Sequence, residues 1–449
     1  MPRRYVIVIA LLASLLACTC QPLPASGTVP PLKLVLVTSR TPSVTPSATA
    51  TPTPWPTVRF TAMPTPSPTP PLEVTATPVQ ASKNWAQRVG LLAPAAVPWD
   101  QLVAEAIAEA SVVLYTDSGR AMTALQELTL QVTELVADGY VADSLDVYLR
   151  LQAETESGQH LADVVLVSDA DRSWGLLQQN RIWTYVPPDL AGLLDGAVQN
   201  GLLTHHWTAV TWVYNPRLGE PAITNWWDLT EPAWAGRVVM ADPRADERIF
   251  VLLAAMEEHT EQLASAYRTR YGRDLVLDEI CPNAACQWFK ALLANKPVLL
   301  YGDAEVAQYM GGADVEEARI GLCGLEQLAH VQAGDVSIYP LVGLEPFTGL
   351  LSRTYIAIAD QAPHPQAAKL AVRWLMGDPG CSRGWDPFCM PGFYSPRSDI
   401  PDPEGAPAGR DLLPRLWETN PQYFVEHQLG LHDWVNLLLK DIPLAGQTP

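Results

Sequence analysis

The chain has 449 residues, 48% of them hydrophobic, and carries a formal net charge of −19. It is too long for a single ordinary core and long enough for two lobes. Its acidic balance excludes an electrostatic surface for nucleic acid or anionic lipid headgroups, because like charges repel. A net negative surface favours solubility, and it also suits a positively charged ligand.

The N-terminal residues have the pattern of an export signal. Arg3 and Arg4 precede an apolar run over residues 6–16, which is too short to span a bilayer core of about 30 Å. The following Leu-Leu-Ala-Cys18 resembles the lipobox of bacterial lipoproteins, which implies cleavage before Cys18 and lipidation of that cysteine. We therefore predict a lipoprotein signal peptide over residues 1–17; the alternative is an ordinary signal peptide with a chance cysteine. We expect the mature protein on the outer face of the cell membrane, held there by the lipid anchor alone.

Threonine, serine and proline dominate much of the next segment, residues 18–82. Such a composition cannot form a core and favours polyproline II structure. We predict a disordered tether, and its residues 41–82 would reach on the order of 130 Å when extended. The composition leaves O-glycosylation of the tether open.

Five cysteines follow the tether. Cys281 and Cys286 are five residues apart, and Cys381 and Cys389 are eight apart. An exported protein can keep disulfides, so the simplest pairing is two local bridges with Cys323 left over. Zinc binding is the alternative, but no histidine falls at useful spacing beside either pair. Sequence alone does not fix the connectivity.

Short apolar runs alternate with helical patterns four times after about residue 107. The runs cover residues 112–115, 164–167, 238–241 and 298–301, and each leads through a polar turn into a helical pattern. Continuous apolar strands that alternate with helices are typical of parallel sheets buried on both faces. The sequence therefore predicts an α/β protein.

The four turns carry polar side chains at the carboxyl ends of the predicted strands. In open parallel sheets ligands bind at these ends, beside the unpaired N–H groups of helix N-termini. Each turn could instead serve only to start a helix: Asp242 is a suitable N-cap, and Pro243 is a suitable first helical residue. Because four such turns occur, we predict that they share one cleft.

Three longer blocks resemble bacterial extracellular solute-binding proteins of the type II periplasmic-binding-protein fold, the receptors of ABC importers. The blocks are AVTWVYNP at 209–216, WWDLTEPAWAGRVVMADPR at 226–244 and APHPQAAKLAVRWLMGDPG at 362–380. The likeness is greatest to the branch that includes ferric-iron, thiamine, polyamine and aminoalkylphosphonate binders. It covers nearly all of residues 107–400.

The resemblance implies two α/β lobes that are joined by crossover strands and close on a ligand by hinge motion. The first lobe is expected over residues 83–208 and 345–449, and the second over residues 209–344. The crossovers are expected near residues 208–215 and 337–344.

The resemblance also assigns ligand contacts to the polar turns, and it implies no cofactor. The first-lobe contacts would be Thr116, Asp117, Ser118, Ser168 and Asp169. The second-lobe contacts would be Asp242, Arg244, Tyr301, Gly302 and Asp303, with Tyr339 in the second crossover.

Two departures from the family pattern bear on the solute. The residues after the Asp-Pro-Arg turn are Ala245-Asp246-Glu247, where the family often has small hydroxyl or glycine residues, and carboxylates repel phosphates. The adjacent tyrosines of ferric binders are absent from the corresponding segment, ARIGLCGLEQLAH. Acidic residues at the expected mouth favour a cation, a metal ion or a zwitterion: Asp117, Asp169, Asp303 and Glu305. Arg244 and the helix N-termini favour an anionic group instead.

We therefore predict a monomeric receptor that captures a small polar solute or ion between its lobes and delivers it to an ABC importer permease. A ligand sensor with the same fold is one alternative. A secreted enzyme is the other, with Cys323 as a nucleophile or with His205 and His206 at a metal site. The chain has no HExxH, serine-elbow or phosphate-loop motif that would support an enzyme.

Overall fold

The computed structural model describes residues 78–443. The predicted signal peptide, the lipidation site Cys18 and most of the predicted tether lie outside the described residues. The tether was predicted to extend to residue 82, but helix α1 (Pro78–Arg88) already includes its last residues. Among the described residues, no helix has both the length and the apolar character needed to cross a membrane.

Two groups of three parallel strands flank a long antiparallel pair, in the order β2-β1-β3-β11-β6-β9-β7-β8. The first lobe holds β1 (Ser111–Thr116), β2 (Val136–Val141) and β3 (Val164–Val167). The second lobe holds β7 (Val238–Ala241), β8 (Val298–Leu300) and β9 (Ile320–Gly324). The predicted two-lobed α/β fold is confirmed, and the four predicted apolar runs are β1, β3, β7 and β8.

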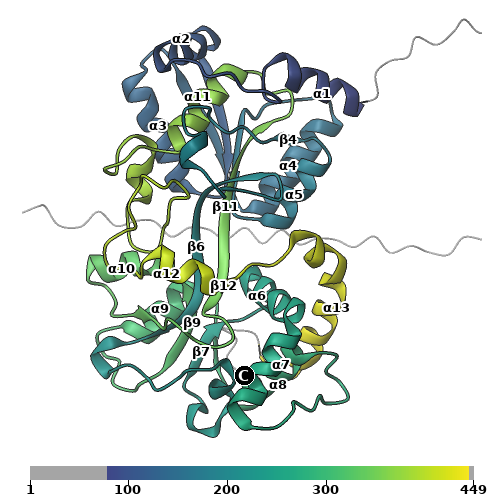
Figure 1. Cartoon of the computed structure of the whole chain (residues 1–449), viewed down its shortest axis with the longest axis vertical. Coiled ribbons are helices and arrows are strands. Elements are labelled where there is room, and N and C mark those ends of the chain that lie inside the picture. Colours follow the sequence, from purple (N-terminus) through teal and green to yellow (C-terminus); the bar gives the residue numbers. More distant parts are fainter. Residues whose placement is uncertain (1–77, 444–449) are drawn as a thin grey trace, which may run out of the picture. The chain divides into compact units, whose positions relative to one another are not determined.

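Helices cover both faces of the sheet in the first lobe (Figure 1). One face packs on α2 (Trp99–Glu109), α3 (Gly119–Gln131) and α11 (Pro365–Leu375). The other packs on α4 (Ser144–Glu156) and α5 (Ala170–Gln178). Strand β3 is buried along its whole length, as an unbroken Val-Val-Leu-Val run requires.

The second lobe repeats this arrangement. One face carries α6 (Glu247–Glu258), α7 (Thr260–Tyr271) and α8 (Ala284–Ala294), and the other carries α9 (Asp303–Gly311) and α10 (Leu328–Ala333). Trp226 lies at the centre of the first of these cores. Its ring stacks on Phe347 with the centroids 4.2 Å apart, and its indole N–H donates to the Phe347 carbonyl at 2.6 Å.

The lobes are joined by β6 (Leu202–Tyr214) and β11 (Gly349–Ala359), which pair with each other and run between the two halves of Figure 1. Strand β6 agrees with the first predicted crossover. The second prediction, residues 337–344, was wrong: the only strand there is β10 (Tyr339–Pro340), which pairs with β6 near its second-lobe end. Proline cannot donate to a strand ladder, so the long strand begins only after Pro340 and Pro346.

The C-terminal part of the chain does not stay in the first lobe as predicted. Strand β12 (Leu416–Trp417) pairs with β11, and α13 (Pro421–Leu439) packs on α6 and α8 of the second lobe and also contacts α5 of the first. Its buried face, which includes Phe424, Leu431 and Val435, joins the second-lobe core. The apolar face of α13 thus packs on the core of the second lobe. The local sequence does not indicate which lobe the helix packs against.

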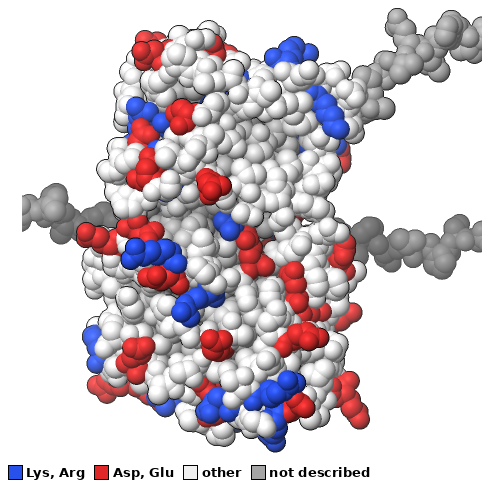
Figure 2. Space-filling model, in the orientation of Figure 1, with Lys and Arg blue, Asp and Glu red and all other residues white. Residues whose placement is uncertain are grey.

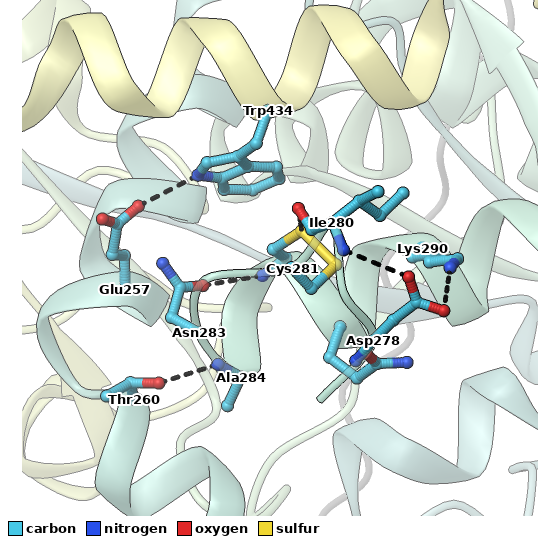
Figure 3. The surroundings of a disulfide bond; sticks show 11 residues. Glu257, Thr260, Asp278, Ile280, Cys281, Asn283, Ala284, Lys290 and Trp434 are labelled. Carbon is cyan, nitrogen blue, oxygen red and sulfur yellow. Dashed lines mark hydrogen bonds and ion pairs between the residues drawn. A yellow bond between two sulfur atoms is a disulfide. The ribbon is translucent and has the colours of Figure 1, made fainter. Parts of the chain in front are cut away.

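Both predicted cysteine pairs lie at disulfide distance. The Cα atoms are 5.2 Å apart for Cys281 and Cys286 and 5.5 Å apart for Cys381 and Cys389. The first pair ties the loop before α8 to its first turn, where the Asn283 side chain accepts from the Cys286 N–H at 2.9 Å (Figure 3). Cys323 is unpaired and buried on β9, and burial raises the pKa of its thiol well above the usual value.

Candidate functional site

A cavity of about 140 Å³ lies between the lobes, against strand β11, which joins them. The first lobe contributes residues at the carboxyl end of β3 and the start of α5, together with the first residue of α4. The second lobe contributes the first residues of α6. The segment from β12 into α13 forms the remaining wall. The polar lining residues are Ser144, Ser168, Asp169, Asp171, Glu247, Arg248, Ser352, Arg353, Tyr355, Glu418 and Thr419.

The first-lobe wall is organised by Asp117. One carboxylate oxygen of this residue accepts hydrogen bonds from the Ser144 hydroxyl at 2.5 Å, the Ser168 N–H at 2.7 Å and the Ser168 hydroxyl at 2.6 Å. Asp117 therefore orients two serines that line the cavity while standing behind them. The neighbouring residues serve the backbone: the Thr116 hydroxyl accepts from the Ser118 N–H, and Ser118 caps α3.

Asp169 has both a structural position and a place in the lining. Its carboxylate caps α5 by accepting from the Arg172 N–H at 3.0 Å, and it pairs with the Arg172 guanidinium. Burial, together with a hydrogen bond to the Asp171 carboxyl, raises the pKa of Asp169 to about 7. Arg172 also reaches across to Glu247 of α6 at 2.9 Å, so one ion pair joins the two lobes at the cavity.

The second-lobe turn after β7 does not have the predicted arrangement. Helix α6 begins at Glu247 and its N-cap is Asp246, so the prediction of Asp242 as N-cap was wrong. Asp242 is fully buried, accepts from the Arg244 N–H at 2.9 Å and pairs with the Arg244 guanidinium at 2.6 Å. The chain first forms a turn in which the Asp242 carbonyl accepts from the N–H groups of Ala245 and Asp246, and the cap falls on the later aspartate.

Arg244 points toward the C-terminal end of α13 and not into the cavity. Its guanidinium donates to the carbonyls of Leu439, Ile442 and Pro443, at 3.4, 2.9 and 3.1 Å. These are carbonyls of the last helical residue and the residues beyond it, which a cation stabilises. The structure thus shows Arg244 holding the end of the C-terminal helix in place.

Arg248, one turn further, faces the cavity. Its guanidinium pairs with Asp246 at 2.8 Å, Asp303 at 3.0 Å and Glu326 at 2.7 Å. Asp303 also accepts from the Gly324 N–H at 2.5 Å, and burial raises the pKa of Asp303 to about 7. Asp303 therefore stands behind Arg248, much as Asp117 stands behind the serines of the other lobe.

Three predicted contacts lie away from the cavity lining. Tyr301 is 62% exposed, and its N–H donates to Glu305 at the start of α9. Gly302 precedes the same helix. Tyr339 is 40% exposed and lies edge-on to Tyr214, with ring centroids 6.3 Å apart. Of the eleven predicted contacts, Ser168 and Asp169 line the cavity, and Asp117 and Asp303 support residues that do.

Sequence reasoning missed the lining residues from β11, from α13 and from the segment between β12 and α13. Arg353 of β11 pairs with Glu418 at 2.6 Å, and burial raises the pKa of the neighbouring Tyr355 phenol, with Glu418 adding to the shift. Arg353 and Tyr355 are two residues apart on an apolar strand, so they lie on the same face. Polar residues at this spacing could have indicated a site on β11. Glu418 lies in a short irregular segment, and no pattern in the surrounding sequence identifies it as a site residue.

The two residues proposed for an enzymatic metal site are packed inside the first lobe. His205 and His206 are buried beside Phe388, and their Nδ1 atoms are 2.7 Å apart. Burial lowers the pKa of His205 to about 4. Over residues 78–443, no three His, Cys, Asp or Glu side chains converge in a way that could hold a metal ion.

Carboxylates outnumber guanidinium groups in the cavity lining, and Arg172 beside the lining pairs with two of these carboxylates. The lining includes the carboxylates of Asp169, Asp171, Glu247 and Glu418 and the guanidinium groups of Arg248 and Arg353. Arg248 is further balanced by three carboxylates outside the lining. Figure 2 shows that, on this face, charged side chains gather mainly over the second lobe and the waist. The site can therefore neutralise a positive group.

Comparison with known proteins supports the fold. Iron-bound HitA from Pseudomonas aeruginosa is 14% identical over 72% of this chain and 99% of its own, with a TM-score of 0.55. The apo ferric ion-binding protein A of Pasteurella haemolytica is 14% identical over 74% of this chain and 98% of its own, also at 0.55. A putative extracellular solute-binding protein of Bordetella parapertussis is 12% identical over 75% of this chain and all of its own, at 0.54. No protein-family model matches the chain, and no curated protein does.

Proposed function

We propose that this chain is an extracellular solute-binding receptor that captures a small polar solute between its lobes and delivers it to an ABC importer. The observation that carries the proposal is the interlobe cavity, which both lobes and the hinge strand β11 line. In a two-lobed fold, such a position lets ligand contacts be made and broken by hinge closure. The fold shared with solute-binding proteins supports the same role.

The solute is proposed to carry a positive charge, as an organic cation, a zwitterion or a metal ion. Four carboxylates and two guanidinium groups line the cavity, and the excess of carboxylates favours a cationic group. The ion pair between Arg172 and Glu247 would break or rearrange on opening, so ligand contacts would add to an interlobe attraction already present.

The receptor is proposed to be lipid-anchored through Cys18, with the Thr/Pro-rich segment as a spacer. The Leu-Leu-Ala-Cys motif after a short apolar run supports this anchor. Labelled palmitate should enter the wild-type protein and not the Cys18→Ser variant. Equal labelling of both proteins would refute the anchor.

Native mass spectrometry of the full chain, purified without refolding, tests the receptor role. A receptor that closes on its solute should carry it through purification, and the mass difference would identify the class. The double variant Glu418→Gln and Asp171→Asn should lose that adduct, while Glu404→Gln, at an exposed site away from the cavity, should keep it. A chain that binds no cation, anion or uncharged solute would refute the proposed function.

A further inference from the structure

The cavity lining includes apolar residues that a simple ion does not need. Val251 of α6, Leu350 and Leu351 of β11, and Pro421 and Phe424 of α13 line it together with the charged residues. Bare or hydrated metal ions prefer oxygen, nitrogen or sulfur ligands on all sides. A lining that combines apolar and charged side chains matches a ligand that has both characters.

The C-terminal segment supplies lining residues of both characters. Strand β12 pairs with the second-lobe end of β11, through Gly349 with Leu416 and Leu350 with Trp417. This pairing delivers Glu418 to the cavity, where it meets Arg353. The chain then enters α13, whose first turn presents Pro421 and Phe424 to the same space.

Several contacts hold this segment rigidly. The Trp417 ring stacks on Phe347 with centroids 3.8 Å apart, and the Thr419 hydroxyl donates to the Val251 carbonyl at 2.9 Å. At the far end of α13, Arg244 binds the final carbonyls. Side chains on a segment fixed at both ends are preorganised, and preorganised contacts lose little entropy on binding.

We propose that the segment from Glu418 to Phe424 determines specificity, and that the solute is an organic cation or zwitterion with an apolar body. Glu418 takes the positive group, and Phe424 takes the apolar body together with Leu350, which belongs to the same core. The inference rests on the proposed receptor function and narrows its solute, excluding a bare metal ion. A cavity of about 140 Å³ limits that solute to a small molecule.

Titration calorimetry of the full chain with matched probes tests this inference. Benzylamine and isoamylamine have both characters, benzyl alcohol has the body without the charge, and methylammonium has the charge without the body. At least one of the two amines should bind about tenfold or more tightly than either control, because the charged hydrogen bond distinguishes it from benzyl alcohol and the buried apolar body distinguishes it from methylammonium.

Variants separate the two contacts. Glu418→Gln should weaken binding of that amine about tenfold and leave benzyl alcohol unchanged, with Glu404→Gln as the control for bulk charge. Phe424→Leu should weaken the amine and the alcohol alike and leave methylammonium unchanged. Its control is Leu429→Ala, at a position of the same helix that is 79% exposed. Phe424→Leu keeps an apolar side chain in the core, so the variant should fold, and its apo melting temperature checks that.

The outcomes distinguish this inference from the function beneath it. If ferric citrate, a sugar or an anion binds in the cavity and the amines do not, the receptor role stands and the inference fails. If an amine binds but Glu418→Gln does not weaken it, the inference also fails. If no solute of any class binds, both fail.

Discussion

The turns after β1 and β7 are both polar and both follow a largely buried strand, but they have different structural roles. After β1, Asp117 stands behind two serines of the cavity wall and fixes them with three hydrogen bonds. After β7, Asp242 and Arg244 form a pair whose guanidinium holds the end of α13. The difference comes from what contacts each turn: the first contacts serines that line the cavity, whereas the second contacts the end of α13, a helix distant in sequence. A polar turn at a strand end can therefore support either a binding cavity or a neighbouring helix. The element that packs against the turn determines which of these two roles it has.

Removing the guanidinium of Arg244 should have the largest effect on stability. Arg244→Ala leaves the buried Asp242 carboxylate without this partner and releases the C-terminal carbonyls, so we expect a loss of about 3 kcal/mol in the free energy of unfolding. Denaturant unfolding measures it, with the exposed Arg410→Ala as the control. A normal unfolding free energy combined with lost solute binding would instead place Arg244 in the solute site and break the comparison.

Removing the Asp117 carboxylate should lower solute affinity more than it lowers the free energy of unfolding. Asp117→Ala frees Ser144 and Ser168, which line the cavity, so we expect solute affinity to fall about tenfold. The unfolding free energy should fall by only about 1 kcal/mol, because the side chain is only partly buried and the serines can turn to water. Should the unfolding free energy fall as far as in Arg244→Ala while affinity is retained, both turns would be structural.

The buried carboxylate of Asp169 predicts a smaller, pH-dependent effect. Its pKa is raised to about 7 in the folded chain, from an ordinary value of 3.8. Between these values the folded state holds a proton that the unfolded state has lost, so this group makes stability fall as pH rises from about 4 to about 7.

The Asp169→Asn variant keeps the neutral form at every pH. Its melting temperature relative to wild type should therefore rise between about pH 4 and about pH 7 and level off above that. Binding of a cationic probe to wild type should strengthen around pH 7, where the carboxyl group in the folded chain loses its proton. A melting-temperature difference that is constant with pH would show that Asp169 does not titrate there.

Much of the fold followed from local patterns. The unbroken apolar runs at β1, β3, β7 and β8 gave the parallel strands, and the polar turns after them gave the edge where the cavity lies. The second crossover was misplaced because residues 337–344 match a family position, whereas Pro340 and Pro346 delay the long strand to Gly349.

Much of the site could not be read from sequence, for a physical reason. Glu418 and Phe424 reach the cavity only because β12 pairs with β11 and α13 packs on α6, and these contacts join residues far apart in the chain. The N-cap of α6 is Asp246 and not the predicted Asp242, because the chain first makes a turn that contains the ion pair between Asp242 and Arg244. The local sequence predicts that a turn forms, but it does not predict which distant element packs against that turn.

Hydrogen–deuterium exchange of the full chain, with and without the solute identified by mass spectrometry, tests the central claim most directly. A solute held between the lobes should slow exchange in three segments together: residues 168–172 of the first lobe, 246–251 of the second, and 416–424 before and within α13. The loop over residues 273–280, remote from the cavity, should exchange equally in both states. Protection confined to one lobe, or absent from residues 416–424, would contradict the account.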